Sequence, residues 1–98
     1  MKNIYQLSTA DRADMMEKVM AVTRDKLFEQ KLNGLKFKEM AAVMGIPKTR
    51  MSEIIRQRYM GDRTLNLLVI HGFLSAADVL PDLSEEQKKA FTAIIAPV

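Results

Sequence analysis

Apolar residues recur at every third or fourth position along most of this chain, and no stretch alternates apolar with polar residues as a half-buried strand does. Turn-forming residues interrupt this pattern at Asn33-Gly34, Gly45, Gly61-Asp62 and Pro81. A helical period broken at these points allows few folds. It predicts an all-α protein, a compact bundle of about five helices that forms one domain over residues 1–98.

The predicted helices span residues 9–31, 36–44, 48–59, 63–74 and 84–95. Ser8 should cap the first helix, and Ser84 with Gln87 forms a capping-box pattern before the last one. Residues 63–74 are apolar almost all round, which predicts a buried central helix. A short turn over residues 75–80 should link it to the last helix. On the first helix we expect Met16, Met20, Thr23 and Leu27 to face the core, with Val19 and Phe28 beside them.

Composition excludes several kinds of chemistry. The 98 residues include no cysteine, so disulfides, thiolate nucleophiles and cysteine metal sites are all ruled out. Neither a glycine-rich phosphate loop nor a nucleophile elbow is present. The one histidine, His71, should be packed or hydrogen-bonded within the fourth helix. We therefore expect no enzymatic activity, no cofactor and no metal ion.

No stretch approaches the 18 consecutive apolar residues that would suggest a membrane span, and no signal peptide is recognisable. The expected location is the cytoplasm. The net charge of +3 is distributed unevenly, because residues 24–63 hold ten basic and five acidic side chains, whereas residues 64–98 hold two and four. A positive middle third beside an acidic tail indicates a surface for a polyanion.

Residues 37–58 have the pattern of two short helices joined by a tight turn, which predicts a helix-turn-helix. Gly45 supplies the positive φ that the corner needs, and Ala41 is small where the two backbones approach. Apolar side chains fill the wedge between the helices. The predicted core of the motif comprises Phe37, Met40, Ala41, Met44, Gly45, Ile46, Met51 and Ile54.

The segments AAVMGI at residues 41–46 and MSEI at residues 51–54 resemble the helix-turn-helix of the phage repressor-like (Cro/C1-type) DNA-binding family. The likeness extends from Arg24 to Leu74. It implies a lambda repressor-like DNA-binding fold and an origin in a phage or another mobile element. The chain departs from the family pattern in two places: Pro47 replaces the usual Ser or Thr cap, and residues 57–63 lack the usual glutamate followed closely by glycine.

The predicted third helix should turn Met51, Ile54, Ile55 and Tyr59 inward. Its opposite side then carries side chains that can contact base edges in a major groove: Lys48, Thr49, Arg50, Glu53, Arg56 and Gln57. Arginine can bind guanine, glutamine can bind adenine, and glutamate can accept a hydrogen bond from cytosine. Four further cations, Lys36, Lys38, Arg58 and Arg63, are placed to hold phosphates and set the register on DNA.

These features predict a sequence-specific regulator of transcription that binds double-stranded DNA and acts as a repressor. One helix-turn-helix reads only a short half-site, so we expect a homodimer. Either the long first helix or the last helix could form the contact between protomers, and the apolar patch of Phe91, Ile94, Ile95 and Val98 could serve it or fold back on the domain. The alternative is an antitoxin-like regulator or an interaction module that uses the same scaffold to bind a protein partner.

Overall fold

One long helix sets the length of the molecule. In the computed structural model, which describes residues 7–95, α1 (Thr9–Leu32) is unbroken over 24 residues. At 1.5 Å per residue it is about 36 Å long, a large part of the 45 Å long axis of the fold. Ser8 caps it as predicted, because the Ser8 hydroxyl accepts a hydrogen bond from the Asp11 amide at 3.1 Å.

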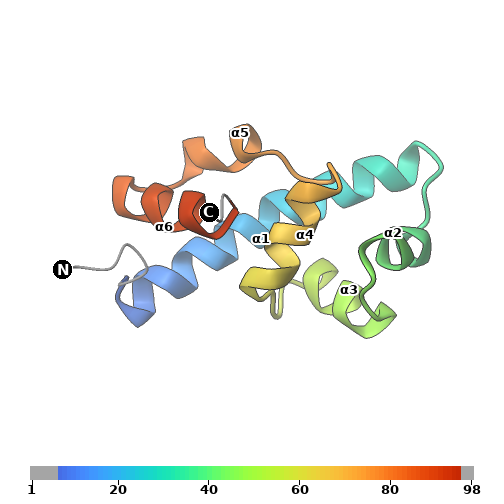
Figure 1. Cartoon of the computed structure of the whole chain (residues 1–98), viewed down its shortest axis with the longest axis horizontal. Coiled ribbons are helices and arrows are strands. Elements are labelled where there is room, and N and C mark those ends of the chain that lie inside the picture. The colour runs from blue at the N-terminus through green and yellow to red at the C-terminus, as the bar shows by residue number, and fades with distance from the viewer. Residues whose placement is uncertain (1–6, 96–98) are drawn as a thin grey trace.

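The other helices pack along α1 (Figure 1). At one end lie α2 (Phe37–Met44) and α3 (Lys48–Ile55), and at the other lies α6 (Glu85–Ile95). α5 (Ala76–Val79) lies over the middle of α1, where Asp78 pairs with Lys26 at 3.5 Å, and the 3-10 turn η1 (Leu80–Asp82) leads from it to α6. Between the two ends, α4 (Asp62–Ile70) packs against α6. The described chain is therefore all-α, as predicted. Among residues 7–95, none of the helices combines the length and apolar character that crossing a membrane requires.

The core-facing row of α1 is Met15, Val19, Thr23 and Leu27, all of them fully buried, with Met20 beside them. These four residues are spaced by four and so form one ridge of the helix. The predicted stripe was right for Val19, Met20, Thr23 and Leu27. Met16 is half-buried and packs against the core, Phe28 is half-buried outside that core, and the prediction missed Met15.

Gln87 ties the start of α6 to α1. It forms the predicted capping box, in which its amide donates to the Ser84 hydroxyl at 3.2 Å and its side-chain oxygen accepts from the Ser84 amide at 3.0 Å. Its side-chain nitrogen donates to the Asp11 carbonyl oxygen at 3.0 Å and to Asp14 Oδ2 at 2.9 Å. Gln87 is buried, and these bonds satisfy both ends of its amide.

The apolar patch near the C-terminus folds back on the domain. Phe91 and Ile94 are buried and Ile95 is half-buried, while Val98 lies outside the described residues. α6 packs against both α1 and α4. Phe91 and Ile94 are thus used within the fold itself, which is the second of the two roles expected for them.

The Gln87 contact makes part of the stability depend on pH. The hydrogen bond from Gln87, together with Lys18 at 3.0 Å, lowers the pKa of Asp14 below its ordinary value of 3.8. A carboxyl whose pKa is lower in the folded state stabilises the fold above its unfolded pKa, and that contribution is lost as pH falls through the folded pKa. We therefore expect Asp14→Asn to be less stable than wild type at pH 7.

The stability difference between wild type and Asp14→Asn should shrink at pH values below about 4. Urea midpoints for both proteins at pH 7 and at pH 2.5 measure it. Asp25→Asn is a suitable control, because Asp25 is exposed on the same helix and forms no ion pair within the described residues. An Asp14→Asn difference that stays constant between the two pH values would refute the coupling.

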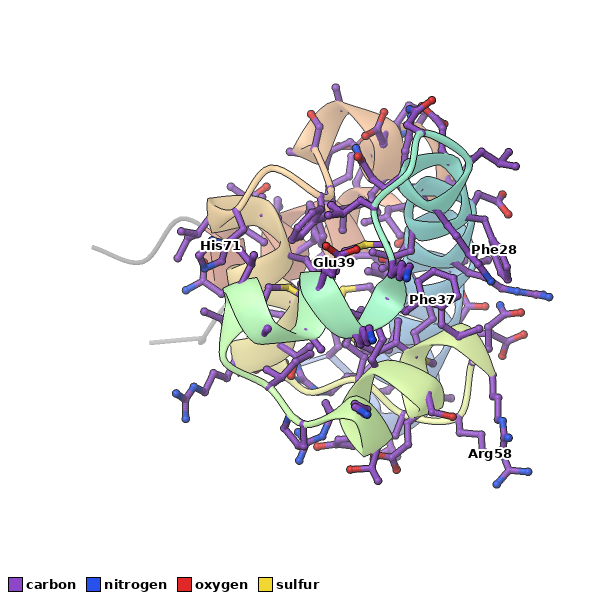
Figure 2. All side chains as sticks on the ribbon, turned by 90° about the vertical axis from the view of Figure 1, so that its right-hand side faces the viewer. Phe28, Phe37, Glu39, Arg58 and His71 are labelled. Atoms are coloured by element: carbon purple, nitrogen blue, oxygen red, sulfur yellow. The ribbon has the colours of Figure 1, made fainter. Side chains whose placement is uncertain are left out.

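The predicted helix over residues 63–74 ends earlier, at Ile70. Gly72 has a φ of +78°, and the Phe73 amide donates to the Leu68 carbonyl at 2.9 Å, which closes the helix and turns Phe73 back into the core. Ile70 is consequently 66% exposed, and His71 lies at the periphery of the fold (Figure 2). The expectation that His71 is packed within the fourth helix was therefore wrong.

Candidate nucleic-acid interface

The turn between α2 and α3 has the geometry that the sequence predicted for Gly45. Gly45 has φ 71° and ψ 30°, the left-handed region that favours glycine. The Gly45 amide donates to the Ala42 carbonyl at 3.1 Å, and the Ile46 amide donates to the Ala41 carbonyl at 3.0 Å. This pair of hydrogen bonds ends α2 and sends the chain into α3 within three residues.

The predicted core of the motif holds α2 and α3 together. Met40, Ala41, Met44, Met51 and Ile54 are buried, and Phe37 and Ile46 are half-buried against them. α3 also packs on α1, so both short helices are held against the long one. The eight residues assigned to the motif core therefore lie where α2 packs against α3 or in the turn between these helices.

Phe37 is fixed by two residues of α1. Its ring meets the ring of Phe28 edge to face, with 5.3 Å between centroids and an interplanar angle of 81°. The ammonium group of Lys31 lies 4.8 Å from the Phe37 centroid, within the range of a cation–π contact. Figure 2 shows Phe37 at one end of α2 with Phe28 beyond it.

α3 begins without a side-chain cap. Pro47 occupies the cap position and offers no side-chain hydrogen bond, so α3 starts at Lys48. The Pro47 carbonyl accepts from the amides of Arg50 and Met51 at 3.0 and 3.3 Å. The departure from the family pattern at Pro47 thus leaves the start of α3 in its predicted place.

The end of α3 differs from the prediction. The helix stops at Ile55 rather than at residue 59, because Gln57 adopts a φ of 55°. The Arg58 amide donates to the Glu53 carbonyl at 2.8 Å and the Gln57 amide to the Ile54 carbonyl at 2.9 Å, the hydrogen bonds of a Schellman motif. Tyr59 lies beyond this stop and is 54% exposed, so it does not face inward.

The conformation of Gln57 leads to a stability prediction. A residue with a Cβ pays about 1–2 kcal/mol in the left-handed region, whereas glycine does not. We expect Gln57→Gly to raise the free energy of unfolding by roughly 0.5–1 kcal/mol. This gain is smaller than the strain that is removed, because glycine also gains conformational freedom in the unfolded chain. Urea denaturation measures this change. Gln57→Val should instead destabilise the protein, and a Gln57→Gly variant less stable than wild type would contradict the assigned conformation.

The six residues predicted to contact bases fall into three groups. Lys48 and Thr49 are exposed on α3, and Arg56 is exposed at its C-cap. Arg50 and Glu53 are half-buried and form an ion pair with 3.7 Å between Nε and Oε1, and the Arg50 guanidinium lies 6.0 Å from the Tyr59 ring centroid. Gln57 lies past the helix, at a cavity of about 880 Å³ between α1 and the loop that follows α3.

Most basic side chains of α2, of α3 and of the residues that follow α3 have no acidic partner. Elsewhere Arg12, Lys18, Lys88 and Lys89 each form an ion pair, whereas the exposed Arg24 and Lys31 of α1 form none within the described residues. Within residues 7–95, no ion pair forms at the six exposed cations Lys36, Lys38, Lys48, Arg56, Arg58 and Arg63. Arg58 projects away from the body of the fold in Figure 2. Four of these cations, Lys36, Lys38, Lys48 and Arg56, lie on or beside α2 and α3. Arg58 follows α3 in the loop and Arg63 is on α4, next to the Asp62 that pairs with Arg12 of α1.

One feature of this surface was not anticipated from the sequence. A cavity of about 210 Å³ opens between α2 and α3, and it is lined by Phe37, Lys38, Lys48, Met51, Ser52, Ile55 and Arg56. Ile55, predicted to face inward, is half-buried against the core and also lines this cavity, and Ser52 lines it as well. The cavity depends on how α2 lies across α3, which helical spacing alone does not give.

Comparisons with protein-family models, with curated proteins and with solved structures found no match. Within the described range, no three or more His, Asp or Glu side chains gather closely enough to hold a metal ion.

Proposed function

We propose that this protein is a sequence-specific regulator of transcription that binds double-stranded DNA through a phage repressor-like helix-turn-helix formed by α2, the turn at Gly45 and α3. The observation that carries the proposal is the set of six exposed cations without acidic partners, Lys36, Lys38, Lys48, Arg56, Arg58 and Arg63. A structural surface normally mixes both signs of charge, whereas binding to phosphates requires unpaired cations.

The proposed roles follow from position on α3. Thr49, Glu53 and Arg56 share one outward arc of the helix and would contact base edges, with Lys48 and Arg50 at its margins. Arg50 is already paired with Glu53, so it would position that carboxylate or exchange it for a base. Gln57 would contact DNA just beyond the end of the helix. Lys36, Lys38, Arg58 and Arg63 would hold phosphates on either side.

The protein would act in the cytoplasm as a homodimer on two half-sites about one helical turn apart, and would repress transcription by occluding polymerase. The rival hypothesis of an interaction module that does not bind DNA predicts an apolar outer face on α3, whereas an antitoxin-like regulator would bind DNA with the same motif and a protein partner with other helices. That face is polar here, and the large exposed apolar side chains, Leu32, Val43, Tyr59 and Ile70, belong to other segments. This observation favours DNA.

The test is selection of bound duplexes from a random-sequence pool at about 150 mM salt, with light scattering on the same sample. We expect an inverted repeat and a dimer. With four phosphate contacts per protomer, the logarithm of the binding constant should fall against the logarithm of salt concentration with a slope of about −7. If no sequence is enriched, the proposal fails and a protein partner becomes the better hypothesis.

A further inference from the structure

Three apolar side chains line the cavity between α2 and α3. They are Phe37, Met51 and Ile55, of which Met51 belongs to the buried core while Phe37 and Ile55 are half-exposed. At about 210 Å³ the cavity is smaller than the roughly 300–1,000 Å³ of a typical small-molecule site. It is better suited to one apolar group carried by a larger partner.

The apolar side chains that line the cavity are held by the rest of the fold. The edge-to-face contact with Phe28 and the Lys31 ammonium group fix the Phe37 ring from the side of α1. Met51 is packed in the core, so it cannot swing into the opening without leaving a void. The cavity is therefore a preformed feature of the surface rather than a gap between mobile side chains.

The polar residues that line the cavity indicate the chemistry of its occupant. Lys38, Lys48 and Arg56 line it, each exposed and without an acidic partner in the described chain, and no acidic side chain lines it. Ser52 also lines it, and its hydroxyl forms no hydrogen bond with any other described residue. The occupant should carry an apolar group beside a hydrogen-bond acceptor, with negative charge on its flanks.

Thymine meets all of these requirements in a DNA duplex. In the major groove it presents the O4 acceptor next to the C5 methyl group, and among the four bases only thymine has that methyl group. Phosphates flank every base and would face Lys38, while Lys48 and Arg56 would contact the bases beside the thymine. Cytosine, by comparison, presents an amino donor and no methyl group at the same position.

We propose that the cavity between α2 and α3 recognises one thymine of each half-site, with the 5-methyl group against Ile55 and Phe37 and the Ser52 hydroxyl donating to O4. This inference rests on the proposed function, because it needs α3 to enter the major groove. It adds Ser52 and Ile55 to the residues that determine specificity.

The experiment replaces each thymine of the selected duplex singly by deoxyuridine, which deletes only the methyl group. At one thymine per half-site, wild-type affinity should fall about fourfold, the factor expected for one buried methyl group. Ile55→Ala should bind thymine and deoxyuridine duplexes almost equally. Ser52→Ala should weaken both by the same factor, because O4 is present in both bases.

Val43→Ala is the matched control. Val43 is also an exposed apolar side chain on α2, but it does not line the cavity, so this variant should keep the fourfold preference for thymine. Ile55 is half-exposed, and a thermal melt of Ile55→Ala checks its folding. The deoxyuridine scan of wild type needs no variant and stays decisive if Ile55→Ala is unstable.

The outcomes separate the two proposals. A selected duplex that tolerates deoxyuridine everywhere, or that contains no thymine, overturns the thymine assignment and leaves DNA binding intact. The assignment also fails if Ile55→Ala retains the full preference for thymine. Absence of any selected duplex overturns both proposals and would point to an acidic, partly apolar protein partner for this cavity.

Discussion

Replacing Phe91 with alanine is expected to lower the free energy of unfolding by about 3–5 kcal/mol. Phe91 is the largest of the fully buried side chains and lies on α6, which packs against both α1 and α4. The truncation would leave a cavity where three helices meet, and backbone held on three sides cannot collapse to fill it. The total free energy of unfolding of a small domain is about 5–15 kcal/mol, so the folded state of the variant should be only marginally stable.

Urea denaturation followed by circular dichroism measures the loss. Thr92→Ala, next along α6 and exposed, is the control and should change stability by no more than about 0.5 kcal/mol. A loss below about 1 kcal/mol for Phe91→Ala would mean that α6 unfolds separately from the rest. Under conditions where the variant remains folded, the surface of α2 and α3 should be unaltered, because α6 lies at the opposite end of α1.

Short-range sequence patterns were sufficient to predict the turn at Gly45 and the buried faces of α2 and α3. Gly45 is a glycine in the conformation that only glycine adopts without cost, and the apolar residues of α2 and α3 follow the helical period. The capping box of Ser84 and Gln87 was equally local. Such features depend on residues a few positions apart, so the sequence is sufficient to predict them.

The sequence pattern predicted ends for α3 and α4 that lie too far along the chain, and the reason differs between the two helices. At the end of α3, the left-handed position is held by Gln57, and a glutamine carries no signal for that conformation. At the end of α4, Gly72 did carry the signal, but the apolar run on both sides of it favoured a longer helix. In the fold, Phe73 and Leu74 reach the core from the turn after Gly72 instead.

Features that depend on packing between distant segments were not predictable. The choice of Met15 over Met16 for the core of α1 depends on where the other helices contact α1. The cavity beside Ile55 depends on the position of Phe37, which Phe28 and Lys31 of α1 fix. Neither the burial of Met15 nor the cavity beside Ile55 follows from the apolar period of a single helix, because each depends on how a second helix packs against the first.

Under the proposed function, Arg56→Ala and Lys38→Ala should weaken DNA binding in different ways. Arg56 lies on the outward arc of α3, where a bidentate contact with guanine is worth about 1–3 kcal/mol. Its loss should lower affinity for the selected site by about 5- to 150-fold and relax the preference at one base pair. Lys38, at the start of α2, should contact phosphate, so its loss should weaken all sequences alike.

Binding isotherms on the selected duplex and on a random duplex, each at several salt concentrations, distinguish these roles. Lys38→Ala should reduce the magnitude of the salt slope by about one per protomer, whereas Arg56→Ala should mainly reduce the ratio of specific to random affinity. Lys89→Ala, which removes an ion-paired cation on α6, is the control for net charge and should change neither. Equal losses on both duplexes for Arg56→Ala would move Arg56 from the bases to the phosphates. Base recognition would then rest on Thr49, Glu53 and the cavity beside Ile55.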